Sequence, residues 1–183
     1  MATLSVIAGP NGSGKSTLTA SLSFEGRANL IDPDAIARRM NPIDPARRAI
    51  PAAREAIVRC KTVIEAGATF VLETTLAGNG AISLMRQANR RGYRIYLVYV
   101  ALGHPDLHIE RVRLRVALGG HDVPEATFAD VTNEVWRKRL THCAWLMKQL
   151  FWITQESIPV AFSHCAKATL FGSTRPFRNG VKT

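Results

Sequence analysis

Apolar and polar residues follow two different periods along the first two thirds of the chain, which predicts strands separated by helices. Runs rich in β-forming residues predict strands at 4–8, 30–31, 69–72 and 93–101. Apolar residues at helical spacing predict helices at 18–22, 45–66, 81–91 and 105–118. In the longest of these, Ile50, Ala53, Ile57 and Ile64 are the expected buried positions. Strands alternating with helices indicate an α/β fold of three layers, with helices on both faces of a parallel sheet.

The chain beyond about Thr127 has a different composition. It contains all three tryptophans, at positions 136, 145 and 152, and its apolar residues show poor periodicity. No clear final strand is visible in it. We therefore expect one domain at residues 1–127 and an atypical tail at residues 128–183, with an irregular or disrupted C-terminus.

A glycine-rich loop connects the first predicted strand to the first predicted helix. It comprises Gly9, Pro10, Asn11, Gly12, Ser13, Gly14, Lys15, Ser16 and Thr17. The spacing Gly-x-x-x-x-Gly-Lys-Ser in this context is the P-loop pattern, whose glycines let backbone N–H groups turn toward phosphates. Lys15 is expected to neutralise the β- and γ-phosphates, and the Ser16 hydroxyl to ligate Mg²⁺. The loop therefore predicts a P-loop NTPase or kinase fold that binds ATP and Mg²⁺.

The same loop string occurs in ABC-transporter ATPases. That class also needs a Leu-Ser-Gly-Gly-Gln-like signature and a strand that ends in two acidic residues, and the sequence has neither. The sequence therefore excludes an ABC ATPase.

Acidic residues follow two of the predicted strands, at the edge where parallel sheets meet their ligands. Two roles fit Asp34 equally: a general base that accepts the proton of a substrate hydroxyl, and a cap for a helix that begins at residue 35. Glu73 fits a contact to Mg²⁺ or to a substrate hydroxyl, with a solvated strand-end acid as the alternative. Thr74, beside it, is a further candidate for substrate binding.

Two arginines, Arg111 and Arg115, lie four residues apart on one predicted helix and therefore share a face. Such a pair suits a lid that closes over a triphosphate and stabilises the transferring charge. The alternative is an ordinary charged helix surface.

Composition narrows the class of partner. The chain of 183 residues has a formal net charge of +10, but its basic residues are scattered and not interleaved with aromatic ones, so nucleic-acid binding is not expected. No apolar run is long enough to cross a bilayer, and the first residues lack the features of a signal peptide, so we expect a cytoplasmic protein without a membrane partner. The two His-Cys pairs fit no common zinc spacing.

Several stretches together resemble the zeta-toxin family of P-loop kinases. They lie at 8–17, 30–37, 70–76, 92–97, 110–116 and 119–125, in the order and approximate spacing of that family. The resemblance implies that Asp34 is the general base, that Glu73 contacts substrate or magnesium, and that Arg111 and Arg115 belong to a lid. It also implies a partner antitoxin and, as acceptor, a UDP-amino-sugar.

The tail departs from the family. Where relatives continue with an arginine run and a strand ending in Leu-Asp-Asn-Ser, this chain reads differently. Codons 127–135 and 142–154, read in a shifted frame, permit both of those family segments in the correct order. Our hypothesis is that the tail after about Thr127 is translated out of frame, with a divergent C-terminal subdomain as the alternative.

These observations predict an enzyme that transfers the γ-phosphoryl group of ATP to a hydroxyl of a small molecule. Asp34 would act as base, and Lys15, Arg111 and Arg115 as charge stabilisers. Two alternatives stay open: a P-loop kinase of another substrate class, and an ATP-binding but catalytically impaired or non-catalytic protein that binds an acidic antitoxin or another polyanion.

Overall fold

The computed structural model describes residues 1–21, 25–76, 78–101, 110–111, 113–114, 116–117 and 149–154. The strands are β1 (Thr3–Ala8), β2 (Leu30–Ile31), β3 (Phe70–Thr74), β4 (Arg94–Ala101) and β5 (Gln149–Thr154). The α-helices are α1 (Lys15–Ser21), α2 (Pro33–Met40), α3 (Ala49–Glu65) and α4 (Asn79–Arg90), and two short 3₁₀ helices are η1 (Arg27–Asn29) and η2 (Pro45–Arg48).

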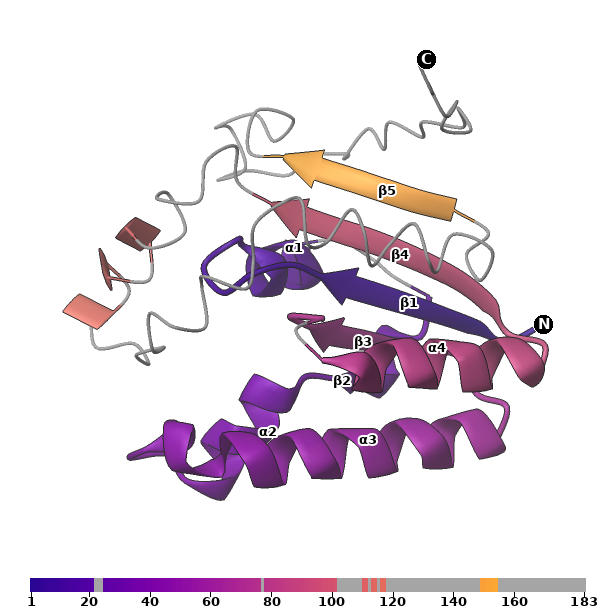
Figure 1. The fold of residues 1–183 in the computed structure, drawn as a ribbon, viewed down its shortest axis with the longest axis horizontal. Coiled ribbons are helices and arrows are strands. Elements are labelled where there is room, and N and C mark those ends of the chain that lie inside the picture. Colours follow the sequence, from indigo (N-terminus) through magenta and orange to yellow (C-terminus); the bar gives the residue numbers. More distant parts are fainter. Residues whose placement is uncertain are drawn as a thin grey trace, which may run out of the picture.

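All five described strands form one parallel sheet in the order β2-β3-β1-β4-β5 (Figure 1). β1 lies at its centre, and all six of its residues are buried. Continuous burial is typical of a parallel strand that is covered on both faces. The predicted α/β fold with a parallel sheet is confirmed.

The side chains of alternate strand residues point to two separate cores. On one face, strand residues such as Val6 and Leu97 pack with residues of α3 and α4, including Cys60 and Met85. On the other face, Ile7, Val71, Val98 and Val100 surround Leu18 of α1. Since successive side chains of a strand point to opposite faces, the sheet lies between two helical layers, as predicted.

Most predicted elements are present, with shifted ends. The long predicted helix begins only at Ala49, because residues 45–48 form η2. Ile64 is buried as predicted, but the rest of the buried stripe differs and consists of Ala52, Ala56 and Cys60, whereas Ile50 is 68% exposed. Three of the four buried residues are small, which lets α3 pack closely against its neighbours, so side-chain size was a misleading guide to burial.

The helix after β2 begins at Pro33, two residues earlier than predicted. Its cap is Asp32, whose Oδ1 accepts a hydrogen bond from the backbone N–H of Asp34 at 2.9 Å. Pro33 suits the first helical position because a proline has no N–H to leave unpaired. The interpretation of Asp34 as the helix cap is therefore wrong.

The absence of a final strand is also a wrong prediction. β5 pairs in parallel with β4 over six residues, from Tyr96 opposite Gln149 to Ala101 opposite Thr154. The run Gln-Leu-Phe-Trp-Ile-Thr contains β-branched and aromatic residues that favour a strand, although the surrounding tail has no clear period. β4 is therefore not an open edge of the sheet.

Residues 110–111, 113–114 and 116–117 are helical, within the helix predicted at 105–118. Apart from β5, the tail lies outside the described residues. The predicted boundary between residues 127 and 128 lies there too, so the boundary and the shifted-frame hypothesis stay predictions.

Candidate phosphate-binding and acceptor site

The turn from β1 into the P-loop requires a glycine at position 9. Gly9 has a φ of 148°, and a Cβ placed on it would lie 2.1 Å from the carbonyl oxygen of Val100. The neighbouring atom belongs to the backbone of β4 and cannot rotate away. Gly9 also donates its N–H to the carbonyl oxygen of Thr74 at 3.2 Å, so the loop is hydrogen-bonded to the end of β3 and lies close against the end of β4.

Lys15 lies inside the loop. Its side chain is 7% exposed in total, and its Nζ donates to the carbonyl oxygen of Pro10 at 2.8 Å. Ser13 is also buried, and its Oγ has no hydrogen-bond partner among the described residues. A buried ammonium and an unpaired buried hydroxyl inside a glycine loop fit the oxygens of a phosphate.

A network of hydroxyl groups around the buried Glu73 joins the first helix to the end of β3. The Ser16 Oγ donates to Glu73 Oε1 at 2.7 Å, and the Thr19 Oγ1 contacts Glu73 Oε2 at 3.3 Å. Glu73 is only 5% exposed, so it is not the solvated strand-end acid that was the alternative. Thr19 was missed by the sequence analysis, although it lies one helical turn after Ser16 on the same face.

The pKa of Glu73 is shifted by its burial and by its neighbours. Burial raises the pKa of its carboxyl group above the ordinary value of 4.5. The hydrogen bond from Ser16 and the positive charge of Lys15 oppose that rise in pKa, and the negative charge of Asp32 adds to it. Glu73, Lys15, Ser16 and Asp32 therefore form one electrostatic unit.

The described residues hold no group of three or more His, Cys, Asp and Glu side chains that could enclose a metal ion. Mg²⁺ in phosphotransferases is commonly bound by one or two protein oxygens together with the phosphates. Ser16 and Glu73 offer such oxygens next to the phosphate loop, so the donor set fits Mg²⁺ rather than a softer metal.

The two aspartates after β2 have different surroundings. Asp32 caps α2, and its Oδ2 forms an ion pair with Arg38 at 3.4 Å. Asp34, in the first turn of α2, has an exposed side chain. The Asp32 side chain thus holds the start of α2, whereas Asp34 is exposed, and its role as the base stays a prediction.

The arginines of the predicted lid are only partly described. Arg111 is helical and exposed, and Arg115 lies outside the described residues. The lid therefore stays a prediction.

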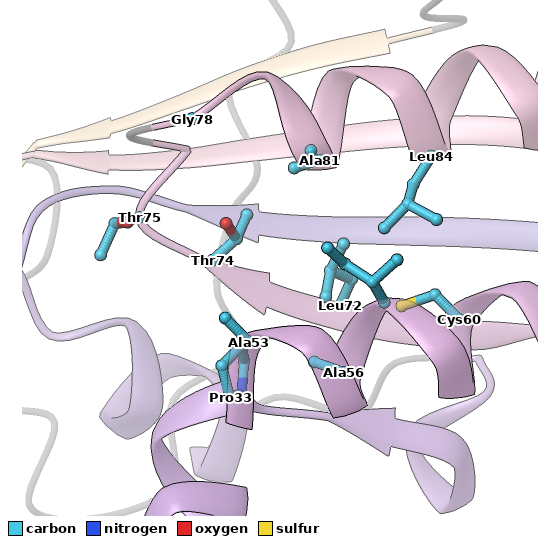
Figure 2. Close-up of a pocket in the computed structure, with 12 residues that line it drawn as sticks. Pro33, Ala53, Ala56, Cys60, Leu72, Thr74, Thr75, Gly78, Ala81 and Leu84 are labelled. Atoms are coloured by element: carbon cyan, nitrogen blue, oxygen red, sulfur yellow. The ribbon is translucent and has the colours of Figure 1, made fainter. Parts of the chain in front are cut away.

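A cavity of about 160 Å³ lies beside the end of β3, between α3 and α4 (Figure 2). Pro33, Thr74 and Thr75 line one end of it, and Cys60 and Leu84 line the other. Thr74, a predicted substrate contact, is thus placed in a cavity. The sequence analysis missed this cavity, whose walls are largely small residues of two helices.

Among the described residues, no helix has the length and apolar character needed to cross a bilayer.

Two comparisons of sequence place this chain among known proteins. Residues 4–137 match the AAA domain family (AAA_33). An uncharacterized protein of Haemophilus influenzae is 37% identical over 117 residues, which cover 64% of this chain and 83% of that protein.

Solved structures share the fold at low sequence identity. One, from the PezAT toxin–antitoxin system of Streptococcus pneumoniae, has a TM-score of 0.58 and 16% identity and covers 92% of this chain and 75% of its own. The AvrRxo1-ORF1:-ORF2 structure with ATP has a TM-score of 0.64 and 13% identity, covering 84% and 55%. Shikimate kinase from Acinetobacter baumannii, in complex with shikimate, has a TM-score of 0.50 and 14% identity, covering 85% and 86%.

These structural likenesses bear on the fold alone, because unrelated activities recur on one fold. A toxin–antitoxin structure and a kinase are both among them, so membership of the zeta-toxin family in particular stays a prediction. The chain belongs to the AAA domain family, and its fold is that of a P-loop kinase-like domain that implies nucleotide binding.

Proposed function

We propose that this protein is a phosphotransferase that moves the γ-phosphoryl group of ATP to a hydroxyl of a small molecule. The observation that carries the proposal is the hydrogen bond from Ser16 to Glu73, which joins residues 57 positions apart. It brings a P-loop hydroxyl and a buried carboxylate together at the end of the sheet where ligands of parallel sheets bind.

Each residue has a separate task in the proposed reaction. The P-loop backbone and Lys15 hold the phosphates of ATP and offset their charge. Ser16 and Glu73 would hold Mg²⁺, which supplies charge neutralisation at the phosphate oxygens when bound. Glu73 keeps the Ser16 hydroxyl in position, and Thr19 orients Glu73.

Asp34 acts as the general base. Its carboxylate accepts the hydroxyl proton while the acceptor oxygen bonds to the γ-phosphorus. The bond from that phosphorus to the β–γ bridging oxygen breaks, its electron pair leaves with ADP, and the proton passes from Asp34 to water. The products are ADP and a phosphate monoester.

The lid, the domain bounds, the acceptor and the partner belong to the same proposal. Arg111 and Arg115 would stabilise the transferring charge from a lid. The domain at residues 1–127 would carry the whole reaction. A UDP-amino-sugar is one acceptor to test, and an antitoxin-like protein is one partner, because two structures of similar fold are named as a toxin–antitoxin system and a two-protein complex.

The test compares single variants of the full chain. We expect Asp34→Asn to retain ATP affinity within about twofold and to lose about 10²- to 10⁴-fold in phosphoryl transfer, as is usual for a missing general base. Lys15→Ala should lose ATP binding and transfer together. The matched control is Asp44→Asn, because Asp44 precedes a 3₁₀ helix without capping it by its side chain and forms an ion pair with exposed Arg47.

ADP and monoester formation are followed by mass spectrometry with a panel of hydroxylated acceptors, a UDP-amino-sugar included. Transfer by Asp34→Asn at the unaltered rate would remove Asp34 from the mechanism. Salt-sensitive binding of polyanions that survives Lys15→Ala, without ADP formation, would instead establish a non-catalytic binding protein.

A further inference from the structure

We propose that the cavity between α3 and α4 is the acceptor pocket, and that it takes an uncharged, largely apolar group of ring size. This inference rests on the proposed phosphotransfer and names the chemical class of its acceptor.

The cavity opens next to the phosphate loop. Thr74 lines it, and the same residue accepts the backbone hydrogen bond of Gly9 at 3.2 Å. Pro33 lines it from the other side and lies between Asp32 and Asp34 in the chain. A group seated in the cavity therefore has its neighbouring atoms between the phosphate loop and the start of α2, where the γ-phosphoryl group and the base are expected.

Exposure distinguishes the mouth of the cavity from its floor. Gly78 and Ala53 are exposed, whereas Ala56 and Cys60 are buried (Figure 2). The cavity is thus open to solvent at one side and closed by the contact of α3 with the sheet at the other. A ligand can enter without displacement of a core side chain.

The lining carries no charge. None of the 12 lining residues is acidic or basic, and their polar side-chain groups are the hydroxyls of Thr74 and Thr75 and the thiol of Cys60. Burial raises the pKa of Cys60 to about 12, so this thiol is neutral at pH 7. A phosphate or carboxylate here would lose water without gaining an ionic partner.

The size of the cavity sets the size of the group. An engineered apolar cavity of about 150 Å³ in another protein accommodates benzene. The cavity of about 160 Å³ found here therefore accommodates one six-membered ring or a branched group of similar volume. The nucleotide part of a sugar nucleotide has to lie outside it, because it is both larger and charged.

The test uses two alcohols and two leucine variants. Benzyl alcohol is the neutral probe, and 4-(hydroxymethyl)benzoate is the same ring with a carboxylate. Gly80→Leu fills the cavity from the first turn of α4, where a Cβ would meet only Ile57 Cδ1 at 3.6 Å and φ is not positive. Ser83→Leu adds the same side chain to an exposed position of the same helix and is the matched control.

We expect the full chain without ATP to bind benzyl alcohol at least tenfold more tightly than its carboxylate analogue, as measured by ligand-observed NMR titration. Gly80→Leu should weaken benzyl alcohol binding at least tenfold, and Ser83→Leu should not change it. With ATP present, Gly80→Leu should raise the KM of the alcohol at least tenfold and leave the KM of ATP unchanged.

Equal binding of the two alcohols, or unchanged binding by Gly80→Leu, would overturn the inference. If the binding pattern holds but no alcohol is phosphorylated by the unaltered chain, the proposed phosphotransfer fails, and the acceptor role falls with it. The two failures are therefore distinguishable, because the binding measurement does not depend on turnover.

Discussion

Glu73 is a carboxyl group held inside the protein by two hydroxyl-bearing residues and by the charge of Lys15. Its burial favours the protonated form, yet the proposed contact with Mg²⁺ requires the carboxylate. The pKa of Glu73 therefore links the stability of the protein to the ability of the site to contact Mg²⁺. A carboxylate placed here is costly to the fold until a cation compensates it.

This gives a prediction for the dependence of stability on pH. Because the folded pKa of Glu73 is raised, the folded protein binds its proton more tightly than the unfolded chain does. Its contribution to the free energy of unfolding is thus fully present below about pH 4.5, the unfolded value, and is lost as pH rises through the folded pKa. Glu73→Gln cannot ionise and should lack this loss.

Urea unfolding of both proteins, without nucleotide or Mg²⁺, measures the effect from pH 4 to pH 8. The free energy of unfolding of the unaltered chain should fall relative to that of Glu73→Gln across this range. A difference that stays constant or grows in the opposite direction would show that the Glu73 carboxyl is not destabilised by its burial.

At the scale of elements, helix α2 depends on its first residues for both stability and chemistry. The cap is provided by Asp32, and the exposed carboxylate two residues later is the proposed base. The two functions are therefore separable by mutation, although the residues are two positions apart. The ion pair of Asp32 with Arg38 adds little, because the arginine is 54% exposed.

We expect Asp32→Ala to lower the free energy of unfolding by about 1 kcal/mol, since loss of an N-cap typically costs about 0.5–2 kcal/mol. Asp44→Ala is the control, because Asp44 stands at the start of η2 but forms no side-chain cap. It should change stability by less than about 0.5 kcal/mol. Chemical denaturation monitored by circular dichroism measures both, and equal effects would contradict the capping role.

The same elements show what the sequence could predict. Strands with dense apolar runs and the P-loop were predictable because their signals are local. The hydrogen bond of Ser16 to Glu73 was not, because it depends on the pairing of β1 with β3. Likewise, the buried stripe of α3 was mispredicted because Ala52 and Ala56 are buried by the close approach of neighbouring elements, not by their own hydrophobicity.

At the scale of the whole molecule, the last strand of the sheet lies in the tail for which we propose a shifted reading frame. β5 occupies positions 149–154, and the shifted frame of these codons permits Val-Val-Leu-Asp-Asn-Ser, the ending of the final strand in the zeta-toxin family. A strand in this place is thus compatible with either frame. The order of the strands alone does not distinguish them.

We expect an independent reading of codons 125–129 to reveal one extra or missing base. The chain with the restored frame should then melt at a higher temperature, because it regains the family's ending beside β4, with about 2–4 °C for each kcal/mol gained at this length. Confirmed codons, with no family ending in the other frame, would refute the shifted-frame hypothesis and leave the divergent subdomain.

The position of β1 at the centre of the sheet also has a consequence for biosynthesis. Chains emerge from the ribosome N-terminus first, and β1 to β4, with the P-loop and Glu73, all precede residue 102. Of the described strands, the edge strand β5 alone comes later, and it pairs with β4. The nascent chain can therefore assemble its phosphate-binding centre before β5 is available, so β5 adds to a centre that is already formed.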